Sequence, residues 1–406
     1  MAPNQHPPLS RPERSHAVTT PHPMIYLDHN ATTPVDPRVL AAMLPYFTEI
    51  FGNAASIDHE PGHAAQNAVE AARAQCAALI NARPAEIIFT SGATESDNIA
   101  LFGVAERYAE KGDHIITCVT EHSAVLDCCA ELERRGKRVT YLPVDQYGTV
   151  DPDAVRRAIT PQTVLISIMF ANNEIGTIAP VREIGAIARE HGVVFHTDAA
   201  QAVGHIPVDV EAMNIDLLSF SAHKCYGPKG VGGLYVRSRR PRVSVAPVIY
   251  GGGHERGMRS GTLNVPGIVG MGVSLEIAAA EMQADAERYR TWTAQMLARL
   301  QAELGTDNVA VNGHPTERLP HNLNVSIRGI ESRSLVVQLK NVAIATGSAC
   351  TTAKVEPSHV ILALGFGEQR AHSAVRMGVG RGNDAEQLEY AVKVIDSKIA
   401  RLRKIQ

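Results

Sequence analysis

Three polar groups in this sequence directly follow short apolar segments, where the end of a buried strand would present them to a ligand. Glu86–Thr90 runs into the small-residue turn Ser91–Thr94, which opens a helical stretch. Backbone N–H groups at such a helix start suit a phosphate, although an ordinary helix cap fits the same pattern. Asp198 ends a second apolar segment and needs a cation or a hydrogen-bond donor, unless it only caps a helix. Lys224 follows a third segment; its amine is poorly hydrated and nucleophilic there, unless it is a surface lysine.

Together these groups form the set that a pyridoxal phosphate enzyme needs. The lysine makes a Schiff base with the aldehyde, the carboxylate keeps the pyridine nitrogen protonated, and the helix start binds the phosphate. His122 lies just beyond another apolar segment, where its imidazole suits the ring face and proton transfer, or equally a helix cap. The nucleotide patterns G-x-x-x-x-G-K-[ST] and, after a strand, G-x-G-x-x-G do not occur in the sequence.

Cys350 stands apart from the other cysteines because it lies in the stretch Ala345–Lys354, which is rich in Gly, Ser, Ala and Thr. Such a stretch has little to bury, so we expect an exposed, mobile thiol that is available for chemistry. Four of the remaining five cysteines lie within helix or strand patterns and are most simply small hydrophobic residues, at positions 76, 118, 128 and 129. Cys225 adjoins Lys224, and we interpret it as a bystander.

The elements that must position these groups alternate between short apolar runs and longer segments of helical period. This alternation is typical of an α/β fold with a mostly parallel sheet covered by helices. The predicted strands number seven: 86–90, 114–117, 139–142, 164–170, 193–197, 217–221 and 233–236. The predicted helices between them span 66–79, 95–111, 124–135 and 184–191.

The pattern changes after a long predicted helix over 274–303. A strand at 322–327, a helix at 332–340 and a final helix from Asp384 indicate a smaller α+β domain. We therefore predict a large domain over 37–281 and a small domain from 24–36 and 282–406. Residues 1–23 contain six prolines and no apolar core segment, which predicts a disordered tail and not a secretory signal.

The composition of the chain excludes several classes of partner. The 406 residues carry a formal charge of −3 and no Lys/Arg block, so we expect neither nucleic acid nor a membrane as partner. The cysteines show no C-x-x-C or framework spacing, which favours reduced thiols and a cytoplasmic location. A metal site from His59 and His63 has the i, i+4 spacing, but we expect Pro61 and Gly62 to break the helix that it needs.

Seven motifs in register resemble those of the cysteine desulfurases, which are pyridoxal phosphate enzymes of the class V aminotransferase superfamily. The resemblance is to the branch that serves iron–sulfur cluster assembly and nitrogen fixation, and it implies the fold-type I architecture. It covers residues 24 to about 403. The motifs are Tyr26–Pro34, Thr90–Asn98, Ala171–Gly176, His196–Asp198, Ser221–Gly230, Gly251–Thr262 and Gly347–Cys350.

The resemblance implies a role for each matching residue. Lys224 is the Schiff-base lysine, Asp198 the pyridinium partner and His122 the stacking imidazole that moves protons. The other cofactor contacts come from the phosphate-binding residues Ala93, Thr94, Ser221 and His223, from Asn173 and Gln201 on the ring hydroxyl side, and from Thr262 of the second subunit of a homodimer. Asn30 and Arg376 bind the substrate, with Arg376 holding its carboxylate.

The resemblance also implies the reaction. Cys350 attacks the sulfur of L-cysteine, leaving L-alanine and a persulfide on the enzyme, and the sulfur passes to an iron–sulfur scaffold protein or another acceptor. A further implication is that Cys350 ligates an iron–sulfur cluster shared with the scaffold. Alternatives are a selenocysteine lyase, a class V aminotransferase, or a platform without turnover; neither of the first two reactions demands the cysteine.

Overall fold

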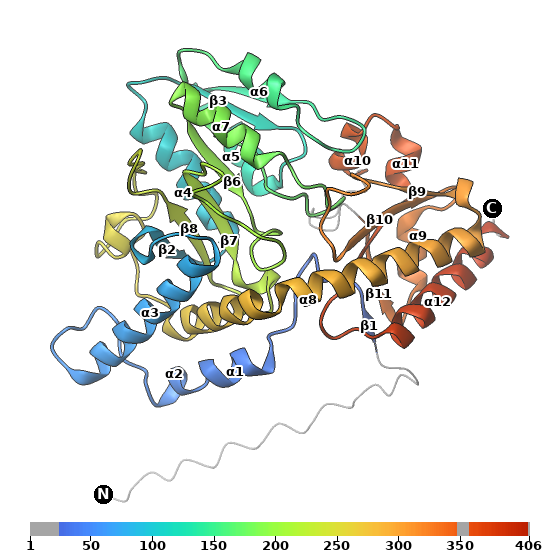
Figure 1. Ribbon diagram of the computed structural model, residues 1–406, viewed down its shortest axis with the longest axis horizontal. Helices are drawn as coiled ribbons and strands as arrows, with labels where there is room; N and C mark the ends of the chain where they lie inside the picture. Colours follow the sequence, from blue (N-terminus) through green and yellow to red (C-terminus); the bar gives the residue numbers. More distant parts are fainter. Residues whose placement is uncertain (1–23, 347–356, 405–406) are drawn as a thin grey trace, which may run out of the picture.

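The computed structural model describes residues 24–346 and 357–404 (Figure 1). The predicted tail at 1–23 and the stretch that contains Cys350 lie outside the described residues. The large sheet has seven strands in the order β2-β8-β7-β6-β5-β3-β4, and β8 alone runs antiparallel to its neighbours. The strands are β2 (Ile87–Thr90), β3 (His114–Cys118), β4 (Arg138–Leu142), β5 (Thr163–Ser167), β6 (Val194–Asp198), β7 (Leu217–Ser221) and β8 (Gly232–Val236). The predicted fold class and all seven strands are confirmed.

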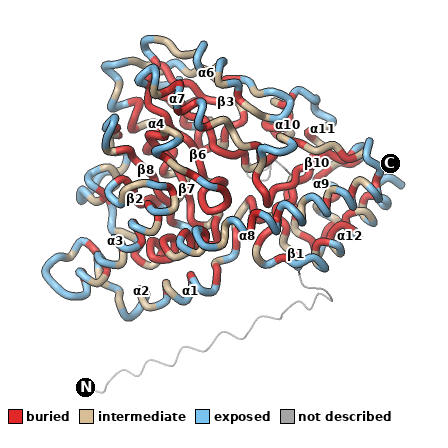
Figure 2. The backbone as a smooth tube through the Cα atoms, viewed as in Figure 1, coloured by how far each residue is buried: buried red, intermediate tan, exposed pale blue. Residues whose placement is uncertain are grey.

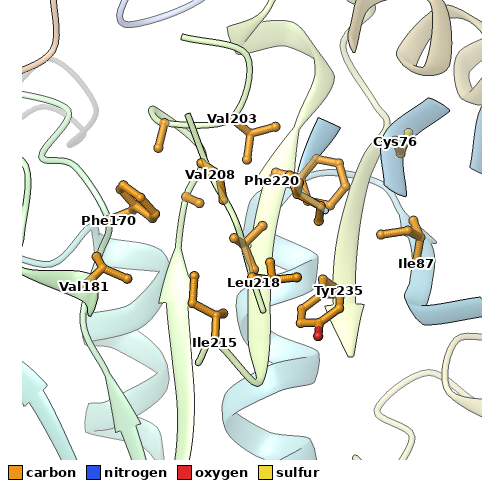
Figure 3. Packing of buried hydrophobic residues seen from close by; sticks show 14 of the residues in the cluster. Cys76, Ile87, Phe170, Val181, Val203, Val208, Ile215, Leu218, Phe220 and Tyr235 are labelled. Atoms are coloured by element: carbon orange, nitrogen blue, oxygen red, sulfur yellow. The ribbon is translucent and has the colours of Figure 1, made fainter. Parts of the chain in front are cut away.

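Helices cover both faces of this sheet because alternate residues of each strand point to opposite sides. Ile88 and Leu217 face α4 (Ala93–Arg107) and α5 (Ser123–Arg134), whereas Ile87 and Leu218 face the opposite layer, which Figure 3 shows from close by. That layer contains α3 (Glu60–Leu79), α6 (Pro152–Ala158), α7 (Val181–His191) and the first half of α8 (Val265–Leu304). Two further helices, α1 (Pro37–Met43) and α2 (Pro45–Thr48), come before α3 in the chain.

A second hydrophobic cluster joins the start and the end of the described chain. Ile25 and Leu27 pack with Leu300, Val325 and Ile395, and Figure 2 shows this buried region beside α9 and α12. An antiparallel sheet in the order β12-β13-β10-β9 and the parallel pair β1-β11 build it. The elements of this region are β1 (Ile25–Tyr26), β9 (Val309–Val311), β10 (Asn322–Ile327), α9 (Ser332–Gln338), β11 (Val342–Ala343), β12 (Ala345–Thr346), β13 (Ala374–Gly378) and α12 (Ala385–Arg403). The short helices α10 (His359–Ala363) and α11 (Glu368–His372) pack in a separate small cluster with Ile175.

Helix α8 runs from one cluster to the other (Figure 1). It begins nine residues before the predicted 274, because the Asn264 side chain caps it and Pro266 fits its first turn. The predicted domain boundary between residues 281 and 282 falls inside this continuous helix, so the domain limits stay a prediction. Of the described helices, α8 has the length and hydropathy of a membrane span, and 56% of that apolar window is buried inside the protein.

Helix α3 corrects the expectation that Pro61 and Gly62 break a helix. The helix begins at Glu60, with Pro61 in its first turn, where proline costs no hydrogen bond. His59 caps it, since its Nδ1 accepts a hydrogen bond from the backbone N–H of Gly62 at 3.2 Å. The sequence reasoning treated the proline as a helix breaker and so placed the helix start at Gln66.

Candidate active site

A cavity of about 550 Å³ lies where the carboxyl ends of the parallel strands meet the N-terminal segment and β13. Its walls bring together eleven of the predicted site residues, namely Asn30, Ala93, Thr94, His122, Asn173, Asp198, Gln201, Ser221, His223, Lys224 and Arg376. Thr262 does not line the cavity of its own chain, and Cys350 lies outside the described residues. Residues more than 340 positions apart in the sequence therefore share one cavity.

Lys224 reaches the cavity from a single turn of 3₁₀ helix that follows β7 (Ala222–Lys224). Its Nζ donates hydrogen bonds to the carbonyl oxygens of Asn30 at 2.7 Å and Ala31 at 2.8 Å. The backbone of Lys224 is held as well, because its carbonyl contacts His205 Nε2 at 2.8 Å. These contacts direct the amine toward the cavity and away from bulk solvent.

Asp198 occupies the end of β6 and is 6% exposed. Its Oδ1 accepts a hydrogen bond from the Ala200 N–H at 2.9 Å. Burial raises the pKa of Asp198, against the lowering effect of that hydrogen bond and of nearby His122 and Lys224. Because Asp198 is buried, its charged form would be stabilised by a cationic partner inside the cavity. A protonated pyridine nitrogen would provide that positive charge.

A second carboxyl, Asp97 on α4, lines the same cavity and was missed by the sequence reasoning. Neither of its oxygens has a hydrogen-bond partner in the described part of the chain, and His196 Nε2 lies 3.5 Å from Oδ1. Burial, and then the charge of Asp198, raise the pKa of Asp97 well above its usual value. Burial lowers the pKa of His196 to about 3, so that imidazole is neutral and offers no counter-charge.

The start of α4 forms the end of the cavity at which the sequence predicts a phosphate. Gly92 caps the helix without a side-chain hydrogen bond, so backbone N–H groups of the first turn face the cavity beside Ala93 and Thr94. A Cβ on Gly232 would come within 2.6 Å of Gly92 Cα, so this glycine allows β8 to approach the turn closely. Ser221 and His223 lie across the cavity wall, and burial lowers the pKa of His223 to about 4.

His122 occupies a position that fits both of the functions that the sequence left open. It caps α5, because its Nδ1 accepts a hydrogen bond from the Ala124 N–H at 3.1 Å, and its ring also lines the cavity. Burial lowers the pKa of His122. The cap fixes the tautomer of the neutral ring: Nδ1 is the acceptor, so Nε2 carries the proton.

The remaining predicted residues form two linked groups. Asn30 and Gln201 hold each other through two hydrogen bonds, Asn30 Nδ2 to Gln201 Oε1 at 3.3 Å and Gln201 Nε2 to the Asn30 carbonyl at 2.9 Å. Arg376 on β13 donates from Nη1 to the Asn173 carbonyl at 3.0 Å. The loop that carries Asn173 is thereby tied to the small sheet.

Glu95 is another cavity residue that sequence reasoning passed over, because it read as an ordinary acidic first-turn residue. Arg259 pairs with it, with Nε 2.7 Å from Oε1. Arg259 belongs to the loop Gly251–Thr262, which Glu255 fixes by a buried ion pair with Arg73 at 2.7 Å. The loop that carries Thr262 is thus attached both to the large-sheet core and to the helix start at the phosphate end.

The class V aminotransferase family model matches residues 25–391. The chain belongs to this family. Curated relatives include the cysteine desulfurase IscS of Anaeromyxobacter dehalogenans, 54% identical over 94% of both chains. The cysteine desulfurase IscS of Rickettsia conorii is 51% identical over 94% of this chain and 92% of its own.

Solved structures of the family agree with the fold. A "NifS-like protein" is 37% identical, with a TM-score of 0.86 over 93% of this chain and 99% of its own. A second structure, "SspA in complex with cysteine", is also 37% identical, with a TM-score of 0.76 over 87% of this chain and 98% of its own. The prediction of a class V enzyme with a NifS-like fold is confirmed.

Family members depend on pyridoxal phosphate, and the cavity fits that group. Lys224 provides the amine, Asp198 a buried carboxyl in need of a cation, and the start of α4 a set of N–H groups for the phosphate. His122 supplies an imidazole of fixed tautomer on the same cavity wall. The predicted cofactor is confirmed by the family, and the described cavity offers an amine, a buried carboxyl and helix-start N–H groups that suit it.

Proposed function

We propose that this enzyme removes the sulfur of L-cysteine, leaving L-alanine, and accepts it on Cys350 as a persulfide. The observation that carries the proposal is the shared cavity of Lys224, Asp198 and Arg376, which combines a cofactor site with a cation for a substrate carboxylate. Curated relatives at 54% and 51% identity, both cysteine desulfurases, and a related structure with cysteine support this substrate.

In this proposal, the position of each described residue determines its role in substrate binding or proton transfer. Arg376 is 2% exposed and presents a buried guanidinium to the carboxylate of the amino acid. Lys224 and the Nε2–H of His122 lie on the same cavity and serve as groups that take up and return protons at the substrate carbon atoms. When bound, pyridoxal phosphate acts as the electron sink for that chemistry.

Sulfur transfer is a displacement on sulfur. The Cys350 thiolate attacks the substrate sulfur, an S–S bond forms, and the substrate C–S bond breaks with its electron pair passing to carbon. That carbon takes up a proton and becomes the methyl group of alanine. Cysteine and the enzyme thiol are thus converted to alanine and an enzyme persulfide without an external oxidant.

Two substitutions test the assignment. Lys224→Ala abolishes the visible absorption of the Schiff base between lysine and cofactor, whereas Cys350→Ser keeps that absorption and binds cysteine but releases no sulfide. Cys225→Ala is the matched control, because that thiol is buried and burial raises its pKa to about 12. Sulfide release by Cys350→Ser at the wild-type rate would show that Cys350 is not the nucleophile.

Product analysis separates the alternative activities. An aminotransferase converts its amino acid to a keto acid, and a selenocysteine lyase prefers selenocysteine to cysteine. The proposal expects alanine in a 1:1 ratio with the sulfur released from cysteine. Accumulation of a keto acid, or turnover with selenocysteine alone, would replace the proposal with one of these activities.

A homodimer is part of the proposal, with Thr262 acting in the partner's site. Large apolar side chains are exposed on and after α1 and α2, among them Phe47 at 57% and Phe51 at 72%, as expected of a surface that another copy covers. Mixed dimers test the assignment of Thr262. A Lys224→Ala chain combined with a Thr262→Val chain keeps one intact site, whereas a wild-type chain combined with the double variant keeps none. The reverse pattern, with the intact site in the mixture of wild type and double variant, would place Thr262 in its own subunit's site, and equal cofactor affinity in both mixtures would show that Thr262 does not bind the cofactor.

The persulfide needs an acceptor, and we propose an iron–sulfur scaffold protein or another thiol protein, with Cys350 as a shared cluster ligand. We place the enzyme in the cytoplasm. All five cysteines in the described part of the chain are free, which supports a reducing compartment. Incubation of the sulfur-35-labelled persulfide enzyme with a purified scaffold protein tests the transfer; label that stays on the enzyme would contradict it.

A further inference from the structure

Arg376 is held by two contacts in addition to its place in the cavity. Its Nη2 donates to Asp28 Oδ1 at 2.7 Å, and its Nη1 donates to the Asn173 carbonyl at 3.0 Å. Its Nε is buried and has no hydrogen-bond partner in the described part of the chain. A guanidinium carries five N–H groups in one plane, so these two contacts fix the plane while donors remain for a further acceptor.

Asp28 approaches Arg376 from outside the cavity. Asn30, Ala31 and Thr32 line the cavity, but Asp28 does not. Its backbone forms a parallel bridge with Gly378, two residues beyond Arg376 on β13. The contact thus joins the N-terminal segment to β13 in a fixed register, and the carboxylate is held beside the guanidinium by backbone pairing.

We propose that Asp28 is a positioning residue that orients the Arg376 guanidinium so that its remaining N–H groups meet the substrate carboxylate. The inference rests on the proposed function, in which Arg376 binds that carboxylate. Asp28 acts through Arg376, because it reaches the arginine side chain and not the cavity. Bidentate binding of a carboxylate depends on the orientation of the guanidinium plane, so loss of this contact lowers substrate affinity.

Three substitutions separate orientation from charge. Asp28→Ala removes the contact, and Asp28→Asn keeps an acceptor at the same place without the charge. Asp28→Glu keeps the charge but moves it by one methylene group. If orientation is what matters, the alanine and glutamate variants weaken carboxylate binding about 10- to 100-fold, the range for loss of a charge-assisted hydrogen bond, and the asparagine variant stays within about threefold of wild type.

The measurement is the dissociation constant of L-alanine, the product, from the holoenzyme, followed by the change in visible absorption of the cofactor. The variants are compared with wild type, with Arg376→Ala and with the double variant Asp28→Ala/Arg376→Ala. In the Arg376→Ala background, Asp28→Ala adds less than about twofold, because the interaction that it removes is already gone. Asp113→Ala is the matched control, since it removes the carboxylate partner of an exposed arginine, Arg138.

The outcomes distinguish the two levels of the hypothesis. Normal alanine binding by Asp28→Ala, with weak binding by Arg376→Ala, overturns the role of Asp28 alone. Normal binding by Arg376→Ala overturns the substrate assignment of the proposed function. An equal loss from Asp28→Ala in both backgrounds, or full binding by Asp28→Glu, overturns the orientation argument. If Asp28→Ala does not fold, the comparison of Asp28→Asn with Asp28→Glu still decides whether orientation or charge determines alanine binding.

Discussion

Glu174 adjoins Asn173 in the active-site loop and is 5% exposed, so its protonation state is coupled to folding. Ser358 Oγ donates a hydrogen bond to its Oε2 at 2.5 Å, and Ser358 also caps α10. Burial raises the pKa of Glu174 to about 7, although the Ser358 hydrogen bond and the charge of Arg376 both lower it. The folded protein therefore holds this proton more tightly than the unfolded chain does.

The sign and size of the effect follow from linkage. Because the folded-state pKa of Glu174 is higher than the unfolded value of 4.5, its contribution to stability is full below pH 4.5 and is lost as pH rises to about 7. The two pKa values differ by about 2.5, and each unit is worth about 1.4 kcal/mol, so about 3 kcal/mol is lost across this window. Glu174→Gln removes the titration and keeps an acceptor for Ser358. We expect Gln to match wild type near pH 4.5 and to be about 3 kcal/mol more stable at pH 8.

Urea unfolding of the holoenzyme at several pH values, at one protein concentration and with excess cofactor, measures this difference. Comparison of wild type with Glu174→Gln cancels the titration of the other buried carboxyls. Glu49→Gln, which removes an exposed carboxyl, is the matched control. A difference between wild type and Glu174→Gln that is the same at pH 5 and pH 8 would refute the reasoning, since it would mean that water reaches the carboxylate in the folded protein.

Three further predictions address the rest of the site. Glu255→Gln removes the buried counter-charge of Arg73 and lowers the unfolding free energy by about 3–5 kcal/mol. Glu70→Gln removes only an exposed partner of the same arginine and has little effect in urea unfolding. Asp198→Asn weakens cofactor binding at pH 7 by about tenfold or more, measured by dialysis and absorbance, because the buried cation loses its counter-ion; unchanged affinity would contradict the assignment. His122→Asn keeps a cap for α5 and so unfolds within about 0.5 kcal/mol of wild type, but alanine formation falls by about 10²-fold or more.

The sequence predicted the large sheet well because its strands are short apolar or β-branched runs, and β2, β5, β6 and β7 each end in a polar residue. The polar ends were also the signal for the site, since carboxyl ends of parallel strands converge on one edge. Helix starts were less predictable. The first turns of α3 and α8 contain Pro61 and Pro266. A proline can end a helix or begin one, and it begins one here because a capping side chain lies just before it.

Asp28, Glu95 and Asp97 escaped prediction for a different reason. Each belongs to one of the seven family motifs, but its contact is made with a residue far along the chain. Asp28 contacts Arg376, Glu95 contacts Arg259, and Asp97 lies beside His196. Spacing along one segment indicates which side chains share a strand end. It does not indicate which distant cation or imidazole packs against them, because that is decided by tertiary structure.

The N-terminal segment shows why the site depends on that tertiary structure. The carbonyl oxygens of Asn30 and Ala31 accept hydrogen bonds from the Lys224 amine, and the Asp28 carboxylate accepts one from the Arg376 guanidinium. Thr33 Oγ1 donates to the His223 carbonyl at 2.9 Å. One stretch of six residues thus contacts both Lys224, the proposed cofactor lysine, and Arg376, the proposed substrate arginine. In the proposed function, the spacing between the Lys224 amine and the substrate carboxylate is therefore set by this segment, whose turn is closed by a hydrogen bond from the Ala31 N–H to the Asp28 carbonyl at 2.9 Å. A residue inserted between positions 28 and 30 would disturb both groups together, even though neither chemical function lies in the segment itself.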